Sequence, residues 1–116
     1  MDKTESIKYG YHYRRAYKKG KFSITKNLVA YAYRNGLGYN RLGVTVKKNT
    51  GKSVERNRIK RLVKENFRYF GNMLEKGYDL VIVARKSSKD ISYWDIRESM
   101  GYSLEKLGVL KREIPN

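Results

Sequence analysis

Residues 78–84, Tyr-Asp-Leu-Val-Ile-Val-Ala, limit the possible folds of this chain more than any other segment. They are rich in β-formers and include the longest purely apolar run of the sequence, 80–84. A strand with one face in water would alternate apolar and polar residues, so this run predicts a strand that is covered on both faces. We therefore expect it at the centre of a sheet.

Periodic segments before this strand predict a helix and three strands. Aromatic and small side chains at helical spacing predict a helix over 10–19, which Gly20 ends. Apolar residues alternate over 28–33 and 41–47, as in half-buried strands, whereas 22–25 is short for a separate strand. These segments place three strands ahead of the central one.

After the central strand, the sequence predicts a last helix. Ser92 and Asp95 have the spacing of a capping box, in which each side chain binds the backbone N–H of the other residue. An apolar stripe follows at helical spacing as far as Gly108, where the helix is expected to end. With a further helix described next, the order α-β-β-β-α-β-α predicts one α+β domain over 1–116, a small α-β sandwich.

The segment 51–67 predicts an amphipathic helix that extends over about 54–70. Gly51 allows a turn before it, Ser53 can cap its free N–H groups, and Glu55 faces the positive end of the helix dipole. The apolar arc contains Ile59, Leu62, Val63 and Phe70. The cationic arc contains Arg56, Asn57, Lys60, Arg61, Lys64 and Arg68.

The charges of this helix are unbalanced. A solvated helix face usually carries acids and bases at i,i+4 spacing, but here only Glu55 and Glu65 accompany the many cations. Like charges without counter-charges repel one another unless an anion binds between them. The helix therefore predicts a polyanion-binding face in preference to an ordinary solvated surface.

The same imbalance extends over the whole chain, which carries 27 Lys and Arg against 11 Asp and Glu and a net charge of +16. Nucleic acid is the default partner of such a domain. The absence of cysteine excludes disulfides, a thiolate nucleophile and a cysteine-based zinc site. The N-terminus lacks the apolar core of a signal peptide and 80–84 is too short to span a bilayer, so a cytoplasmic protein without membrane contact is expected.

The side chains offer no autonomous catalytic site. His12 is the only histidine, and it lies among tyrosines without an evident acidic partner, so we expect a packing or exposed role. The acids are scattered singly, which predicts neither a pair of catalytic carboxylates nor a metal cluster. If the chain takes part in catalysis, another molecule carries the chemistry.

Aromatic residues suggest a second binding element. Tyr13, Tyr17 and Tyr31 can line one groove beside the basic helix, where rings stack on unpaired bases and cations hold the backbone. The alternative is that all three are ordinary core and rim residues. For Tyr13 and Tyr17 both interpretations remain open, whereas a strand residue such as Tyr31 is more typical of packing.

Four ordered segments of the chain resemble the protein subunit of bacterial ribonuclease P, over about 7–107. The signature of that family is an Arg-Asn-Arg motif on the basic helix, here at 56–58. The other matching segments are 41–48, 78–85 and the N-terminal Tyr13-x-x-x-Tyr17-x-x-Gly20. A short basic motif alone would be weak evidence, but four segments in the same order and spacing are specific.

The resemblance implies a sheet flanked by helices, with the basic helix making an unusual left-handed crossover between parallel strands. It implies that the chain is an accessory subunit that binds ribonuclease P RNA, one protein to one RNA, and precursor tRNA. The holoenzyme would hydrolyse one phosphodiester to remove the 5′ leader. The RNA would hold the catalytic Mg²⁺ ions, and Asn57 is the side chain that the resemblance suggests for any metal contact.

The resemblance assigns two sets of RNA-contacting residues and no catalytic residue. The signature set on the helix, expected to meet RNA near the active centre, is Arg56, Asn57, Arg58, Lys60, Arg61, Lys64 and Arg68. The leader-binding set is Tyr13, Tyr17, Tyr31, Lys47 and Lys48. The family usually has phenylalanine at the position of Tyr13, and ring stacking tolerates the added hydroxyl.

Three other functions compete with this interpretation. A ribosomal-type structural RNA-binding protein suits the composition and the α+β form equally well, and only the ordered motifs distinguish it. A DNA-binding regulator would need a helix-turn-helix pair or a dimerisation seam, and neither is evident. A self-sufficient nuclease lacks a carboxylate or histidine site.

Overall fold

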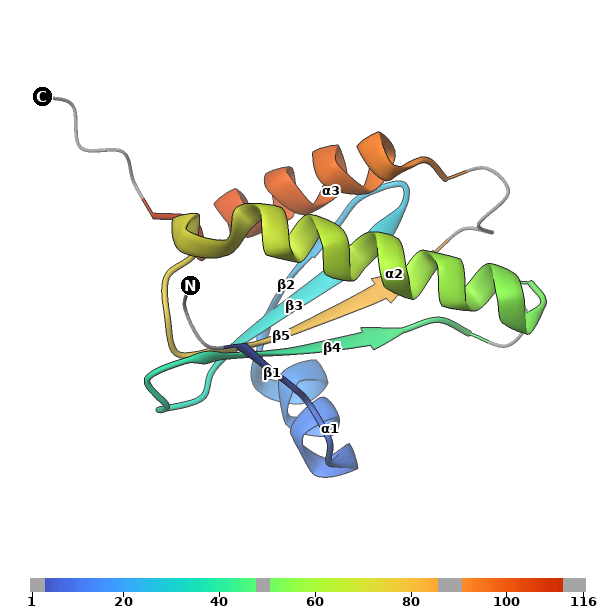
Figure 1. Ribbon diagram of the computed structural model, residues 1–116. Coiled ribbons are helices and arrows are strands. Elements are labelled where there is room, and N and C mark those ends of the chain that lie inside the picture. The colour runs from blue at the N-terminus through green and yellow to red at the C-terminus, as the bar shows by residue number, and fades with distance from the viewer. Residues whose placement is uncertain (1–3, 48–50, 86–90, 112–116) are drawn as a thin grey trace, which may run out of the picture.

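The computed structural model describes residues 4–47, 51–85 and 91–111. Within them, a five-stranded sheet with the order β1-β4-β5-β3-β2 forms the middle layer. Helices α2 and α3 cover one face of this sheet, and α1 lies against the other face (Figure 1). The elements are β1 (Thr4–Ser6), α1 (Gly10–Lys19), β2 (Lys21–Ile24), β3 (Leu28–Arg34), β4 (Asn40–Thr45), α2 (Ser53–Phe70), the short 3-10 helix η2 (Gly71–Met73), β5 (Tyr78–Ala84) and α3 (Tyr93–Lys106).

Strand β5 occupies the centre of the sheet, as its apolar sequence predicted. It pairs in parallel with β4 and antiparallel with β3. Leu80 and Ile82 are buried in the main core beneath α2 and α3, whereas Val81 belongs to a smaller core with Ala16 of α1. The strand is apolar throughout because a helical layer removes each of its faces from water.

The predicted helices and strands are all present, with small differences at their ends. Helix α1 spans the predicted residues, α2 begins at Ser53, and β4 covers Asn40–Thr45 where 41–47 was expected. The short segment near 22–25 does form a strand, β2, because it pairs antiparallel with β3. Strand β1 was not predicted; its three residues pair in parallel with β4 at the edge of the sheet.

Two predicted helix caps have different outcomes. At the start of α3, the Ser92 hydroxyl accepts a hydrogen bond from the Asp95 N–H (3.1 Å) and the Asp95 carboxylate accepts one from the Ser92 N–H (2.9 Å), which confirms the capping box. The prediction that Ser53 caps α2 is wrong. Lys52 holds the cap position without a side-chain bond, and Ser53 already lies in the first turn of the helix.

The amide of Asn66 joins α2 to α3. It is fully buried within the apolar arc of α2, and its Nδ2 donates to the carbonyl oxygens of Leu62 (3.0 Å) and Tyr93 (3.2 Å). Its Oδ1 accepts a hydrogen bond from Nε of Arg97 (2.9 Å). Because every polar atom of this amide has a partner, the helices are held in one orientation. The cationic arc of α2 faces away from the core, because the apolar arc of the same helix is buried in it.

Helix α2 connects two neighbouring parallel strands. It leaves β4, crosses the face of the sheet that it shares with α3, and returns to β5 (Figure 1). This agrees with the crossover between parallel strands that the resemblance implied. The left hand of that crossover stays a prediction.

Candidate nucleic-acid interface

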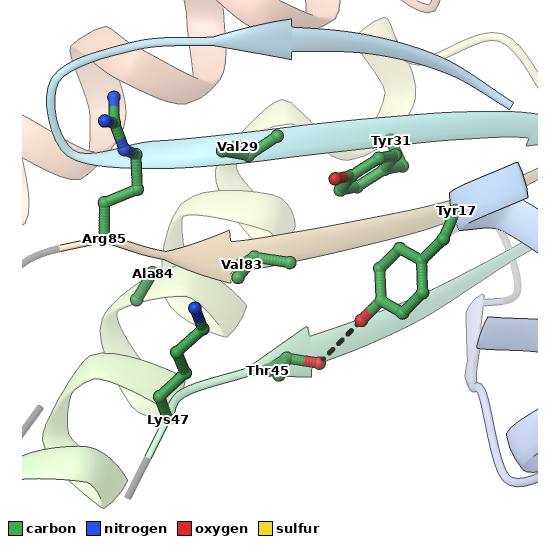
Figure 2. A pocket seen from close by; sticks show the side chains of 8 residues that line it. All are labelled: Tyr17, Val29, Tyr31, Thr45, Lys47, Val83, Ala84 and Arg85. Carbon is green, nitrogen blue, oxygen red and sulfur yellow. Dashed lines mark hydrogen bonds between the residues drawn. The ribbon is translucent and has the colours of Figure 1, made fainter. Parts of the chain in front are cut away.

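An open cleft of about 630 Å³ lies at the carboxyl ends of β4 and β5, on the α1 side of the sheet (Figure 2). Tyr17 and Tyr31 form an aromatic wall, with ring centroids 4.9 Å apart and the rings edge to face. Lys47 and Arg85 place cations on the opposite side (Figure 2). The remaining lining residues are Val29, Thr45, Val83 and Ala84. Ring faces and cations around one hollow suit an unpaired base with its phosphate.

Parallel strand pairing creates this cleft. Because β4 and β5 run in the same direction, Thr45 pairs with Val83 and the residues that follow each strand emerge at one edge of the sheet. Lys47 follows β4 and Arg85 follows β5. The hydroxyl oxygens of Tyr17 and Thr45 are 3.3 Å apart, which ties α1 to β4 at the same edge.

Two residues that were not predicted from the sequence, Arg85 and Phe22, belong to this surface. Arg85 lines the cleft, and its Nη1 donates to the Thr25 carbonyl (2.7 Å), which fixes the side chain beside the β2–β3 turn. The ring of Phe22 is 58% exposed and its centroid is 6.1 Å from that of Tyr31, so it extends the aromatic wall. Arg85 could have been found from the parallel pairing of β4 with β5, because the residues that follow the two strands then lie at the same edge of the sheet. No sequence pattern points to Phe22.

Tyr13 lies beside the cleft without lining it. Its ring centroid is 6.4 Å from that of Tyr17, and the ring packs on the backbone of Gly43 in β4. Burial raises the pKa of the Tyr13 hydroxyl, so this side chain stays neutral. Tyr13 therefore packs between Tyr17 and β4 as a rim residue, and its stacking role stays a prediction.

The outer side of α2 forms a second, separate surface that we call the cationic hollow. It has a volume of about 350 Å³ and is lined by Asn57, Lys60, Arg61, Lys64, Glu65 and Arg68. All of these except Glu65 belong to the predicted signature set. Arg61 and Glu65 approach within 3.8 Å, but both are well exposed, so the pair neutralises little of the field. The hollow keeps a net positive charge, because it also contains Lys60, Lys64 and Arg68.

Arg56 and Arg58 of the signature set do not line this hollow. The Arg56 Nη1 donates to the Gly51 carbonyl (2.7 Å), across the turn before α2. The Arg58 Nη1 donates to the Ile91 carbonyl (2.9 Å), which joins the first turns of α2 to the segment before α3. The predicted set therefore divides into an exposed cationic group and two arginines with backbone partners at the start of the helix.

The cleft and the cationic hollow lie on opposite faces of the sheet. Helix α1 and the cleft occupy one face and α2 the other, with β4 near the edge between them (Figure 1). The expectation that the tyrosines share a groove with the basic helix is wrong, because α2 packs on the far side of the strands. Lys48, also expected at the cleft, lies outside the described residues. Two polyanion segments can occupy the two surfaces without competing.

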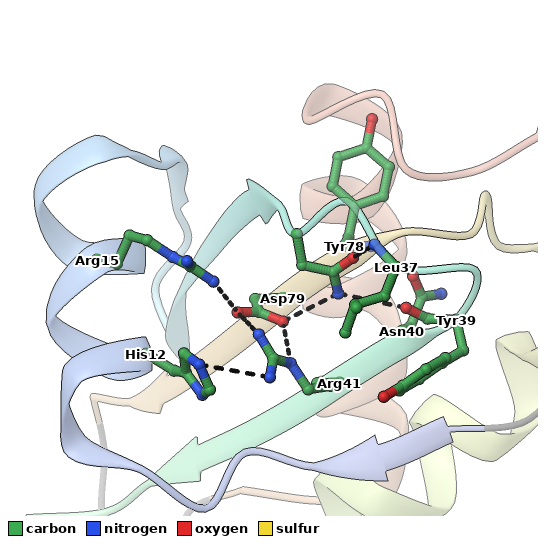
Figure 3. Close-up of polar contacts among 9 residues, drawn as sticks. His12, Arg15, Leu37, Tyr39, Asn40, Arg41, Tyr78 and Asp79 are labelled. Carbon is green, nitrogen blue, oxygen red and sulfur yellow. Dashed lines mark hydrogen bonds and ion pairs between the residues drawn. The ribbon is translucent and has the colours of Figure 1, made fainter.

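Asp79 is a buried carboxylate at the start of β5 that holds two arginines from different elements (Figure 3). Arg41 donates from Nε to Oδ1 (2.7 Å) and from Nη2 to Oδ2 (2.9 Å), and Arg15 of α1 donates to Oδ2 (3.3 Å). The amide of Asn35 donates to Oδ1 (3.0 Å). Burial alone would raise the pKa of Asp79, but the bonds from Arg41 and Asn35 outweigh it and hold the pKa below its usual value.

His12 lies next to this network (Figure 3). It is 8% exposed, its Nε2 is 3.5 Å from Nη1 of Arg41, and its Nδ1 has no hydrogen-bond partner within the described residues. Burial and the charge of Arg41 lower the pKa of His12, so the ring is neutral at pH 7. The predicted packing role of His12 is the one that the structure shows.

Two absences can be stated for residues 4–47, 51–85 and 91–111. No cluster of three or more His, Cys, Asp or Glu side chains is placed to hold a metal ion. No helix in these ranges combines the length and the apolar content needed to cross a membrane.

The fold and the two surfaces define a small basic α+β protein with an aromatic cleft on one face and a cationic helix on the other. A model of the Ribonuclease P family matches residues 1–108, nearly the whole chain. The chain belongs to the ribonuclease P protein family, which acts in tRNA processing as part of a ribonucleoprotein nuclease. The resemblance predicted from the ordered motifs is thereby confirmed.

Individual relatives agree with this assignment. The "Ribonuclease P protein component" of Clostridium kluyveri is 48% identical over 107 residues, which cover 90% of this chain and 96% of the relative. The protein of the same name in Clostridioides difficile is 40% identical over 101 residues, covering 86% and 89%. The solved RNase P protein of Staphylococcus aureus has a TM-score of 0.84 at 32% identity, covering 94% of this chain and 100% of that one. The Thermotoga maritima structure has a TM-score of 0.76 at 33% identity, covering 89% and 94%.

Proposed function

We propose that this chain is the protein subunit of ribonuclease P and that it assists removal of the 5′ leader from precursor tRNA by binding two RNAs. Family membership supports the subunit role. The catalytic RNA, one per protein, carries the bond-breaking chemistry. The protein contributes affinity and placement.

The cleft is assigned to the leader. Tyr17 and Tyr31 offer ring faces on which unpaired bases can stack, and Lys47 and Arg85 lie across the cleft from them, where they can hold the phosphates. This juxtaposition is the observation that carries the proposal. Stacking is tolerant of sequence, since every base has a π face, so the cleft does not need a particular leader sequence.

The cationic hollow is assigned to the catalytic RNA. Lys60, Arg61, Lys64 and Arg68 project from one side of α2, and only Glu65 opposes them within the hollow. Phosphates bound here release counterions, so this contact depends strongly on salt. Because the hollow and the cleft lie on opposite faces, one protein can hold the catalytic RNA and the leader together.

Mg²⁺ in the holoenzyme is assigned mainly to RNA ligands. In the hollow only Asn57 and Glu65 offer side-chain oxygens, and the four neighbouring cations oppose a divalent ion. These residues do not fit a magnesium site without phosphate ligands. The protein's role toward the metal is electrostatic, because its cations reduce the repulsion between two converging RNA strands.

The test combines the chain with ribonuclease P RNA and precursor tRNA at low Mg²⁺ concentration. Leader removal is expected to be faster with the protein than without it. Tyr17→Ala should lower affinity for precursor tRNA by about 5- to 150-fold, the loss of one stacked base, and leave affinity for mature tRNA unchanged. Tyr17→Phe keeps the ring and should retain most of the affinity.

Tyr102→Ala provides a matched control, because Tyr102 is an exposed tyrosine on α3, on the other side of the sheet. It should behave like the parent chain in both assays. Binding of the catalytic RNA without any effect on leader removal or leader affinity would replace the proposal with the alternative, a ribosomal-type structural RNA-binding role.

A further inference from the structure

Two exposed tyrosines lie stacked at the start of α1. The rings of Tyr9 and Tyr11 are 58% and 54% exposed, with centroids 5.5 Å apart and planes inclined by 23°. Exposed aromatic rings in adjacent positions leave apolar surface in water that a ligand with a flat face can cover. We call this feature the tyrosine pair.

The tyrosine pair is held in place by a packed neighbour. The His12 ring lies 4.2 Å from the Tyr11 centroid and 5.6 Å from that of Tyr9, and it is itself buried against Arg41. Rings that are already ordered lose little conformational freedom when a ligand stacks on them. The pair therefore resembles a preformed binding surface more than two freely rotating side chains.

The charges around the pair favour a phosphate-bearing ligand. No acidic residue occurs between Ile7 and Lys19, whereas the cations of this segment are Lys8, Arg14, Arg15, Lys18 and Lys19. Lys8 and Arg14, which lie nearest to the pair in sequence, are both exposed. A nucleotide base with its phosphate satisfies the ring faces and the cations at once.

Helix α3 also carries exposed aromatic side chains, and their charged neighbours differ from those of the tyrosine pair. Trp94 and Tyr102 are as exposed as the tyrosine pair, and Arg97 and Lys106 lie over their rings. On this helix, however, Glu98 and Glu105 accompany the cations and would repel phosphate. Aromatic exposure alone therefore does not mark a nucleotide site in this chain. At the start of α1 the exposed rings coincide with cations that no acid of the same helix accompanies.

The tyrosine pair is separate from the cleft. Tyr17 reaches over β4 and β5 at their carboxyl ends, whereas the tyrosine pair packs with His12, which faces Arg41 and Asp79 at the beginning of β5 (Figures 2 and 3). None of the residues that line the cleft belongs to the pair. A ligand here extends the RNA-binding surface beyond the two regions already assigned.

We propose that Tyr9 and Tyr11 form an additional stacking site for an unpaired RNA base, with Lys8 and Arg14 holding the adjoining phosphates. The proposal rests on the RNA-binding function proposed above. The base belongs either to the precursor leader or to an unpaired segment of the catalytic RNA, and both present the same chemistry to the rings.

The test measures the affinity of the full chain for two probes, a single-stranded oligoribonucleotide with a leader sequence and ribonuclease P RNA alone. The double variant Tyr9→Ala/Tyr11→Ala should bind at least one probe about 5- to 150-fold more weakly. Tyr9→Phe/Tyr11→Phe should bind like the parent chain, because stacking needs only the ring. If the double alanine variant loses affinity for the oligoribonucleotide, the stacked base comes from the leader. If it loses affinity only for ribonuclease P RNA, the base comes from the catalytic RNA.

Unchanged affinity of the double alanine variant for both probes overturns the inference, and so does an equal loss in Tyr102→Ala. Tyr17→Ala, measured in parallel, separates the two proposals. If Tyr17→Ala binds more weakly and the double variant does not, the assignment of the cleft to the leader is supported and only the stacking site at the tyrosine pair is rejected. Circular dichroism confirms that the variants fold, as expected for exposed positions.

Discussion

The ring of Tyr13 packs so closely on Gly43 that a Cβ at residue 43 would lie 2.6 Å from the ring atom Cε1. Gly43→Ala should therefore displace the Tyr13 ring and with it the neighbouring Tyr17. We expect a loss of about 1–3 kcal/mol in the free energy of unfolding, the usual cost of overpacking, measured by urea denaturation. Leader affinity should fall as well, because the aromatic wall moves.

A double-mutant cycle identifies the cause of this effect. In a Tyr13→Ala background the added methyl group at residue 43 meets no ring, so the second substitution should cost much less than it does alone. Equal costs in both backgrounds would show that the strain arises elsewhere in β4.

Removal of the buried carboxylate should destabilise the fold strongly. Asp79→Ala leaves the guanidinium groups of Arg41 and Arg15 without their shared partner, and we expect a loss of about 3–5 kcal/mol in the free energy of unfolding. Chemical denaturation at pH 7 measures it. As a control, Glu65→Ala removes an exposed acid of an ion pair and should cost less than about 1 kcal/mol.

Acid should weaken the same contact. Because the folded pKa of Asp79 lies below 3.8, its stabilising effect is complete above that pH and is lost as the pH falls through the folded value. The parent chain should therefore lose stability below about pH 4 more steeply than Asp79→Asn, which has no carboxylate to protonate at this position. Parallel curves for the two proteins in that range would contradict the prediction.

His12 should act in a different pH window. Its pKa is lowered from 6.5 in the folded state, so the unfolded chain binds more protons as the pH falls below 6.5. Stability should decline from about pH 6.5 downwards until the folded pKa is passed. In His12→Phe, which keeps a buried ring without a titrating group, this decline should be absent, as thermal denaturation between pH 7 and 5 can show.

The salt dependence of the affinity for ribonuclease P RNA should show whether the cationic hollow contacts phosphates. Each of Lys60, Lys64 and Arg68 that contacts a phosphate contributes to the slope of log affinity against log salt, by about 0.7 to 0.9 per contact. Replacement of one by Ala should reduce the slope for ribonuclease P RNA by roughly that amount. Lys106→Ala, an exposed cation at the end of α3, should leave the slope unchanged and serves as the control.

The elements with strong local patterns were predictable. Helix α1, strand β5 and the Ser92–Asp95 capping box follow from periodicity and spacing within short segments. Strand β1 could not be predicted, because Thr4–Ser6 has no apolar alternation and is held only by pairing with β4. The predicted cap at Ser53 was wrong by one residue, which is the usual uncertainty of helix ends.

Three of the residues predicted for the leader, Tyr17, Tyr31 and Lys47, do line one cleft, but the arrangement of the two surfaces was not predicted. Sequence order does not say on which face of a sheet a connecting helix packs, so the separation of the tyrosine cleft from α2 needed the structure. The Asp79 network joins residues that are distant in sequence, and a single acid among apolar residues gives no sign of its partners. Arg58 was assigned by its motif, although its side chain bonds the Ile91 carbonyl.

The position of β5 has a consequence for synthesis of the protein. Strands β1 and β4 on one side, and β2 and β3 on the other, have no hydrogen bonds to each other without it. A nascent chain that ends before Tyr78 therefore holds two unconnected pairs of strands, and the domain can close only after residue 84 has left the ribosome. Until then the chain has no cooperative fold, and the highly cationic, incomplete chain is open to proteases and to non-specific RNA.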